Sequence, residues 1–182
     1  MIEEFRAVYS ATPASQEEVK SMKAFISHSS SDAAIAEALV ELLRAALTLP
    51  AKEIRCTSVD GYKLPAGADS NEQLRQEVFA SEAFVALLSP ASVRSVYVMF
   101  ELGARWGTGQ PMVPIMVGGL NVSDLKAPLS AIHAISGTSE SDLHELVEQL
   151  ADRLQRPLEK PSAYGKALRA FMVAAAPLPV TA

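Results

Sequence analysis

The stretch KAFISHSSSDAAIAEALVELLRAAL, residues 23–47, contains three successive patterns that decide the fold class. Its first five residues form a short apolar run, which is typical of a buried strand. The polar loop HSSSD follows, and its Ser31 or Asp32 is placed to cap a helix over Ala33–Leu47. Apolar side chains recur at helical spacing at Ile35, Leu39, Leu42, Leu43 and Ala46. This order of strand, loop and helix predicts the first half of a βαβ unit.

The same alternation continues along the chain. Further strands are predicted over residues 53–59, 83–89, 111–117 and 131–136, and further helices over 70–81, 91–106, 141–154 and 162–175. The strands are apolar throughout rather than half polar, which is typical of a parallel sheet covered by helices on both faces. We therefore expect an α/β, flavodoxin-like, doubly wound fold with a parallel sheet of about five strands.

The chain of 182 residues predicts one domain rather than two. Residues 1–22 are a polar lead-in, residues 23–156 carry the strand and helix pattern, and residues 157–182 hold a C-terminal helix and a loose tail. We expect this last helix to pack on the domain, and a dimer surface is the alternative. There are no internal repeats.

Composition excludes several classes of function. The net charge is −5, and the basic residues are dispersed, so no nucleic-acid partner is expected. No apolar run reaches the roughly 18 residues needed to span a bilayer, and the N-terminus lacks the features of a signal peptide. Cys56 is the single cysteine, so an internal disulfide is impossible, and we expect it to be a small buried side chain. These observations predict a soluble cytoplasmic protein with no membrane partner.

Three polar loops are expected to meet at one edge of the sheet. They are the HSSSD loop, the loop within residues 58–69, and the turn at Ser89–Pro90. Each follows a predicted parallel strand, and ligands of such sheets bind outside the carboxyl ends of the strands.

The segment FELGARWG, residues 100–107, places a carboxylate within an apolar run. Tyr97, Glu101 and Arg105 fall on one helical face, so a surface Glu–Arg pair is the simplest interpretation. The alternative is a carboxylate at a cleft rim, with Tyr97 as a stacking wall. The expected core stripe is Val93, Val96, Phe100 and Gly103, and Trp106 is also expected in the core.

Other chemistries are weakly supported. His28 lies beside three serines, but no G-x-S-x-G motif is present, so we interpret this segment as a polar loop. The glycines form neither G-x-G-x-x-G nor a P-loop. His133 and His144 are isolated, so no metal site is predicted.

Four motifs together resemble the bacterial type of TIR (Toll/interleukin-1 receptor homology) domain. They are FISHSSSD, CTSVDGYKLPAG, ALLSP and YVMFELGARWG, in the order and spacing of that family from Lys23 to about Leu154. The resemblance implies a five-stranded parallel sheet with helices on both sides. It also implies cleavage of the nicotinamide–ribose bond of NAD+, with NAD+ as substrate and no cofactor.

The resemblance also implies a set of site residues. Glu101 matches the essential glutamate of the family's W-x-x-x-E pattern, while Tyr97 stands in the tryptophan position, which is a departure. Residues 58–69 match the loop that mediates assembly and gates the cleft. The substrate-binding residues implied are Phe25, His28, Ser29, Ser30, Asp60, Tyr62, Leu64, Gly67, Tyr97 and Arg105. Arg105 is expected to orient Glu101 or to meet a phosphate.

The implied activity is that of an NAD+ glycohydrolase or an ADP-ribosyl cyclase. Its product is ADP-ribose or a cyclic ADP-ribose-type signal, in bacterial antiphage defence. The implied partners are further copies of the chain, joined through residues 58–69, and a separate sensor or effector protein. Three alternatives remain open: a non-enzymatic adaptor, a virulence protein that interferes with host signalling, and a nucleoside deoxyribosyltransferase-like enzyme.

Overall fold

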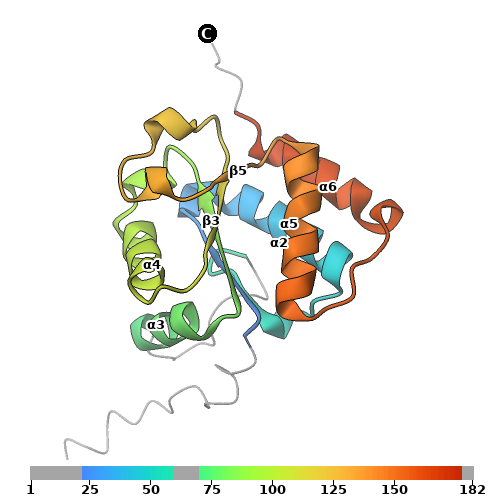
Figure 1. The fold of residues 1–182 in the computed structure, drawn as a ribbon, viewed down its shortest axis with the longest axis horizontal. Coiled ribbons are helices and arrows are strands. Elements are labelled where there is room, and N and C mark those ends of the chain that lie inside the picture. The colour runs from blue at the N-terminus through green and yellow to red at the C-terminus, as the bar shows by residue number, and fades with distance from the viewer. Residues whose placement is uncertain (1–21, 60–69, 178–182) are drawn as a thin grey trace, which may run out of the picture.

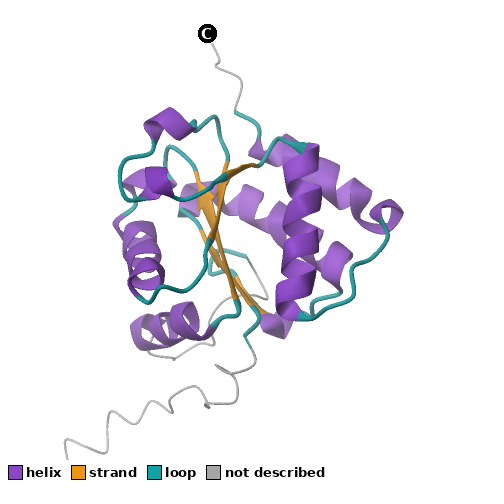
Figure 2. Cartoon of the chain, in the orientation of Figure 1, coloured by secondary structure: helices purple, strands orange, loops and turns teal. Residues whose placement is uncertain are grey.

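The computed structural model describes residues 22–59 and 70–177. Within them, five parallel strands form one sheet in the order β2-β1-β3-β4-β5 (Figure 2). The strands are β1 (Ala24–Ser27), β2 (Ile54–Arg55), β3 (Ala83–Leu88), β4 (Val113–Met116) and β5 (Ile135–Ser136). This is the strand order of flavodoxin-like folds, so the predicted fold class is confirmed.

Helices cover both faces of the sheet (Figure 1). One face carries α2 (Ala33–Leu47), α5 (Glu140–Leu154) and α6 (Pro161–Ala175), and the other carries α3 (Ser70–Ala80) and α4 (Val96–Gly107). None of the helices in the described residues is long and apolar enough to cross a membrane.

The central strands β1 and β3 bury both of their faces, as the apolar runs predict, whereas β5 at the edge of the sheet is only partly buried. Side chains alternate between the two faces of a strand, so β1 sends Ile26 to the core under α2 and Phe25 to the core under α4. The Phe25 ring stacks on Phe84 of β3, with 5.5 Å between ring centroids. This stacking binds the two central strands on the α4 side of the sheet.

The C-terminal helix is part of the domain. Four side chains of α6 are buried in the same core as α2 and α5: Tyr164, Leu168, Phe171 and Ala175. The Tyr164 hydroxyl also lies 2.9 Å from His144 Nδ1 of α5. The expectation that this helix packs on the domain is confirmed.

The α4 helix departs most from the sequence prediction. It begins at Val96 rather than at residue 91, because Ser92–Arg94 form a separate 3-10 turn and Ser95 caps the helix. Its buried positions are Val98, Leu102 and Arg105, whereas the predicted stripe residues Val96 and Phe100 are exposed, as is Trp106. Both sets have helical spacing, and a helix that is apolar on all sides gives no signal for which side faces the core.

Smaller differences concern the ends of elements. The strands predicted over 53–59 and 131–136 are shorter, at 54–55 and 135–136. Asp32 stands at the N-cap position of α2, but its side chain makes no capping hydrogen bond there. Its carboxylate instead accepts a hydrogen bond from the hydroxyl of Ser89, in the loop that follows β3.

Candidate active site

From β1 the chain first adds β2 on one side of the sheet and then returns to add β3 on the other, so the strand order switches between β1 and β3. The site lies at the carboxyl end of β1, beside this switch point. Ser27, the last residue of β1, is buried and donates a hydrogen bond from its hydroxyl to Glu101 Oε2, at 2.6 Å. Glu101 comes from the middle of α4, which packs on this face of the sheet. The structure thus places the carboxylate where flavodoxin-like folds bind ligands.

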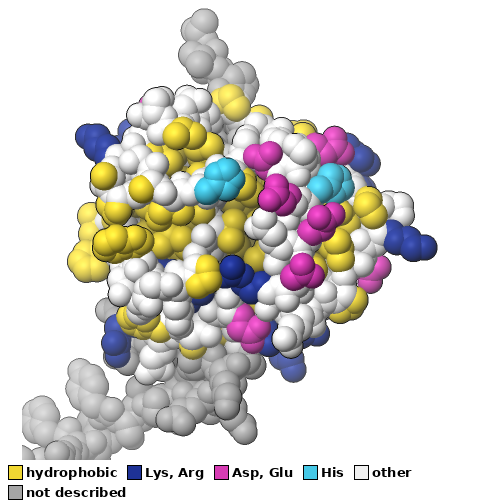
Figure 3. Space-filling model, viewed as in Figure 1, with side chains coloured by type: hydrophobic (Ala, Val, Ile, Leu, Met, Phe, Trp, Pro, Cys, Tyr) yellow, Lys and Arg dark blue, Asp and Glu magenta, His cyan; other side chains and the backbone are white. Residues whose placement is uncertain are grey.

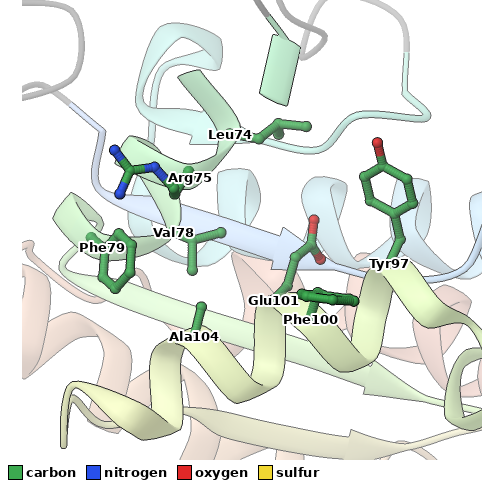
Figure 4. A pocket seen from close by; sticks show the side chains of 8 residues that line it. All are labelled: Leu74, Arg75, Val78, Phe79, Tyr97, Phe100, Glu101 and Ala104. Atoms are coloured by element: carbon green, nitrogen blue, oxygen red, sulfur yellow. The ribbon is translucent and has the colours of Figure 1, made fainter. Parts of the chain in front are cut away.

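Glu101 lies in a pocket between α3 and α4 that has a volume of about 270 Å³. The walls are Leu74, Arg75, Val78 and Phe79 from α3, and Tyr97, Phe100, Glu101 and Ala104 from α4 (Figure 4). The Glu101 carboxylate projects from α4 into the space between the two helices, flanked by Leu74 and Tyr97. Most of the wall is apolar or aromatic, and its two charged members are Glu101 and Arg75.

Burial changes the acidity of the carboxylate. Desolvation raises the pKa of Glu101 to about 7, and the hydrogen bond from Ser27 offsets only part of that rise. Both the ionised and the protonated forms are therefore populated near neutral pH. Such a group, placed in a cleft, is a candidate for catalysis.

Arg105 has a structural role, which corrects both interpretations of it. Its guanidinium is buried and donates from Nη1 to the carbonyls of Val78 and Ser81, at 2.9 and 3.0 Å. Its Nε donates to the carbonyl of Pro111 at 3.1 Å. All these acceptors are backbone groups, so Arg105 joins α4 to the end of α3 and the start of β4. It is not available to pair with Glu101 or to meet a phosphate.

A buried ion pair fixes the opposite wall. Arg55 of β2 donates from Nε and Nη2 to the two carboxylate oxygens of Glu77 on α3, at 2.5 and 2.7 Å. Gln73 adds a hydrogen bond to Glu77 at 3.0 Å. A two-pronged contact of this kind sets orientation as well as distance, so it holds α3 in register against the sheet.

The loops after β1 and β3 are also tied together. The hydroxyl of Ser89 donates to Asp32 Oδ2 at 2.6 Å, and the Ser89 backbone N–H donates to the Ser92 hydroxyl at 2.7 Å. All three side chains are buried. Two of the three loops that the sequence brings together thus meet as expected, next to Ser27.

Of the site residues expected from the sequence, the pocket brings together Glu101 and Tyr97. Phe25 does not line it, because its side chain is buried against Phe84 in the core between the sheet and α4. Ser29 accepts a weak capping hydrogen bond from the Ser31 N–H, at 3.4 Å, and Ser30 is exposed. The pocket walls of the described structure include neither serine.

His28 is directed away from Glu101. Its Nδ1 lies 3.1 Å from the Ile26 carbonyl and its Nε2 contacts the Ser58 hydroxyl. Burial lowers the pKa of His28, so the ring is neutral near pH 7. Because successive side chains leave a strand on opposite faces, His28 and Ser27 diverge.

The remaining expected residues cannot be placed. Asp60, Tyr62, Leu64 and Gly67 lie outside the described residues, as does most of the 58–69 loop. Their contribution to the site stays a prediction.

Sequence reasoning missed Ser27 and the α3 wall. Ser27 is the only hydroxyl side chain in the β1 run and shares the strand face of Phe25, which is the signal that could have found it. The apolar wall of α3 carries no such signal, because Leu74 and Val78 look like ordinary core positions.

The structure offers little for other chemistries. Among the described residues, no group of three or more His, Cys, Asp or Glu side chains is placed to hold a metal ion. Cys56 is buried, as expected, and burial raises the pKa of its thiol to about 11. A thiol of this kind is a poor nucleophile.

Comparison with known proteins agrees with this fold. An 84-residue segment of the chain is 36% identical to the uncharacterized protein YddK of Bacillus subtilis (strain 168). That match covers 46% of this chain and 31% of YddK, so it spans less than a third of the relative's length. The family model of the TIR domain, a domain that commonly self-associates, matches residues 24–151. Because this match spans well over half of the chain, the protein belongs to the TIR domain family.

Proposed function

We propose that this protein cleaves the nicotinamide–ribose bond of NAD+, with Glu101 as the catalytic carboxylate. The observation that carries the proposal is the position of Glu101. Its carboxylate is hydrogen-bonded to Ser27 in a mostly apolar pocket at the carboxyl end of β1. The family resemblance of the Tyr97–Glu101 spacing supports the same assignment.

The chemistry requires one negative charge rather than an acid–base pair. The nicotinamide ring of NAD+ is already cationic, so it leaves as a neutral base when the C–N bond breaks and takes the bonding electrons with it. Positive charge then develops on the ribose, as in glycoside hydrolysis. A carboxylate held in a poorly hydrated pocket stabilises that charge strongly. Addition of water to the ribose carbon and loss of a proton gives ADP-ribose, whereas attack by the adenine base gives a cyclic isomer.

The pocket walls fit the nicotinamide end of the substrate. Tyr97 and Phe100 present aromatic rings beside Glu101, and such rings attract a cationic heteroaromatic group. A volume of about 270 Å³ holds a nicotinamide and part of its ribose but not a dinucleotide. The rest of NAD+ therefore extends beyond this pocket.

Mass spectrometry of the products tests the proposal. Concentrated protein incubated with NAD+ is expected to release nicotinamide together with ADP-ribose or a cyclic isomer. Glu101→Gln keeps the shape of the side chain and its hydrogen bond from Ser27 but removes the charge. We expect it to lower the rate at least about 100-fold. Glu148→Gln, an exposed position on α5, is the matched control and is expected to keep the wild-type rate.

Two outcomes would contradict the proposal. Equal rates for Glu101→Gln and the wild type would remove Glu101 from the reaction. Transfer of sugar between free nucleosides, without cleavage of NAD+, would favour a deoxyribosyltransferase-like enzyme.

The identity of the product would extend the proposal. Cleavage to a cyclic product would extend it to signalling in antiphage defence, and cleavage to ADP-ribose would extend it to NAD+ depletion.

A further inference from the structure

Arg75 differs in charge from the other walls of the Glu101 pocket. It lies on α3, and its side chain is exposed. Among the described residues that line the pocket, Arg75 is the cation and Glu101, on the facing helix, is the anion. The two helices thus contribute one charge of each sign to a mostly apolar pocket.

The two charges lie at different places along the pocket. Tyr97 lies at one end of it, Glu101 in the middle, and Arg75 at the other end (Figure 4). Phe79 accompanies Arg75 there, because residues four apart lie on the same side of a helix. A bound molecule that extends from Tyr97 past Glu101 therefore comes to Arg75.

We propose that Arg75 binds the phosphate on the 5′ carbon of the substrate's nicotinamide ribose, and that it thereby selects nucleotides over nucleosides. The inference rests on the proposed function, because it takes Glu101 as the group that faces the ribose. It adds a residue that binds and positions the substrate without touching the bond that breaks.

The order of groups in the substrate matches the order of side chains in the pocket. A nicotinamide nucleotide carries a cationic ring, then an uncharged ribose, and then an anionic phosphate. When the ring lies against Tyr97 and the ribose lies at Glu101, the phosphate is directed toward Arg75. The reverse orientation would set the cationic ring beside a guanidinium, which electrostatics disfavours. The pocket of about 270 Å³ ends before the phosphate, so the phosphate lies at its margin, where Arg75 is exposed.

A cation at this margin also answers a problem of charge. The substrate's phosphates approach a protein with a net charge of −5, and the nearest one lies one sugar away from the Glu101 carboxylate. Arg75 offsets that repulsion. A guanidinium presents paired donors that match two phosphate oxygens, and it stays charged across the working pH range. Because Arg75 is exposed, neither charge has to be buried for them to pair.

Substrates with and without the phosphate test the inference. NAD+ and nicotinamide mononucleotide carry the 5′ phosphate, whereas nicotinamide riboside lacks it. Arg75→Met removes the charge and keeps a flexible apolar stem. We expect it to lower kcat/KM about 10-fold or more for the two nucleotides, mainly through KM, and to leave the value for the riboside near that of the wild type. Arg75→Lys should recover part of the loss, because it restores the charge but not the paired donors.

Arg94→Met is the matched control. Arg94 is also exposed and lies just before α4, but it lines a neighbouring groove and not the Glu101 pocket. We expect this variant to stay within about twofold of the wild type for all three substrates. Added salt gives a second comparison. It should reduce the preference of the wild type for nucleotide over riboside and have little effect on that of Arg75→Met.

Two outcomes would overturn the inference while NAD+ cleavage stands. An equal loss for all three substrates in Arg75→Met would give Arg75 a structural role. Equal losses in Arg75→Met and Arg94→Met would show a general attraction rather than a contact with phosphate.

A wild type that cleaves none of the three substrates would instead contradict the proposed function. Calorimetric binding of nicotinamide mononucleotide then decides the role of Arg75 separately. Binding that weakens about 10-fold or more in Arg75→Met and not in Arg94→Met would support the inference. Equal binding by the wild type and Arg75→Met, or no binding by either, would overturn it.

Discussion

The α4 and α5 helices pack on opposite faces of the same sheet, and their outer surfaces differ in kind. The outer positions of α5 are polar or charged: Glu140, Ser141, Glu145, Glu148, Gln149, Asp152 and Arg153. Those of α4 are apolar or glycine. Figure 3 shows the acidic side chains over α5 and the hydrophobic ones over α4. The difference indicates that α5 only closes the core, whereas α4 serves both the core and something outside it.

The largest expected effect is the difference in unfolding free energy between a substitution on the buried face of α4 and one on its exposed face. Leu102→Ala removes a buried side chain and is expected to lower the free energy of unfolding by about 2–5 kcal/mol, as is Leu146→Ala on α5. Phe100→Ala removes an exposed ring and is expected to cost less than about 1 kcal/mol in dilute protein. Urea denaturation measures all three variants. An equal cost for Phe100→Ala and Leu102→Ala would restore the stripe that the sequence predicts.

A second contrast uses the arginines of the two helices. Arg105→Met leaves three backbone carbonyls without their donor and is expected to lower the free energy of unfolding by about 2–4 kcal/mol. Arg153→Met changes an exposed side chain of α5 and is expected to stay within about 0.5 kcal/mol of the wild type. Chemical denaturation checks both values. A silent Arg105→Met would mean that its hydrogen bonds contribute nothing to stability.

Glu101 also makes stability depend on pH. Its pKa is about 7 in the folded protein and near 4.5 when unfolded, so the folded state holds the proton more tightly. The stability that follows from this is present below about pH 4.5 and is lost as the pH rises through 7. We expect Glu101→Gln to remove a decline on the order of 2 kcal/mol across that range. Denaturation midpoints at pH 5 and pH 8 measure it, and an unchanged difference between them in Glu101→Gln would contradict the raised pKa.

The smallest effect concerns Ser27. Its hydrogen bond favours the ionised form of Glu101, so Ser27→Ala is expected to raise the pKa of that carboxyl further, by about one unit or less. Ser27→Thr keeps the hydroxyl and is expected to restore the wild-type value. The pH at which nicotinamide release reaches half of its maximum reports the change. A purely structural role for Ser27 would lower activity equally at every pH.

The sequence predicted the α5 side of the molecule well because its polar and apolar residues are segregated. The buried side of α5 contains the whole predicted set, Leu143, Leu146, Val147, Leu150 and Leu154, together with Ala151. The same reasoning was wrong for α4, where Val98 and Leu102 have the same spacing as Val96 and Phe100. Periodicity identifies a core face only when the opposite face is polar.

Only the site residues that stand out in the sequence pattern of α4 were predicted. Glu101 stood out as a charge within an apolar run, and Tyr97 followed from its helical spacing. Ser27 and the apolar wall of α3 depend on tertiary packing. Arg105 was interpreted from its i, i+4 spacing as a partner of Glu101, and that spacing does not show that the side chain is buried against backbone carbonyls. The part played by residues 60–69 stays a prediction.

The pH dependence of kcat/KM for nicotinamide release from NAD+ tests the central claim most directly, because it reports the ionisation of the free enzyme's essential groups. If the ionised Glu101 carboxylate stabilises the ribose cation, kcat/KM should rise with pH to a plateau, with a midpoint near the Glu101 pKa of about 7. The residual rate of Glu101→Gln should lack that rise. A profile that is flat from pH 5.5 to 8.5, or the same profile in Glu101→Gln, would contradict a catalytic role for this carboxylate.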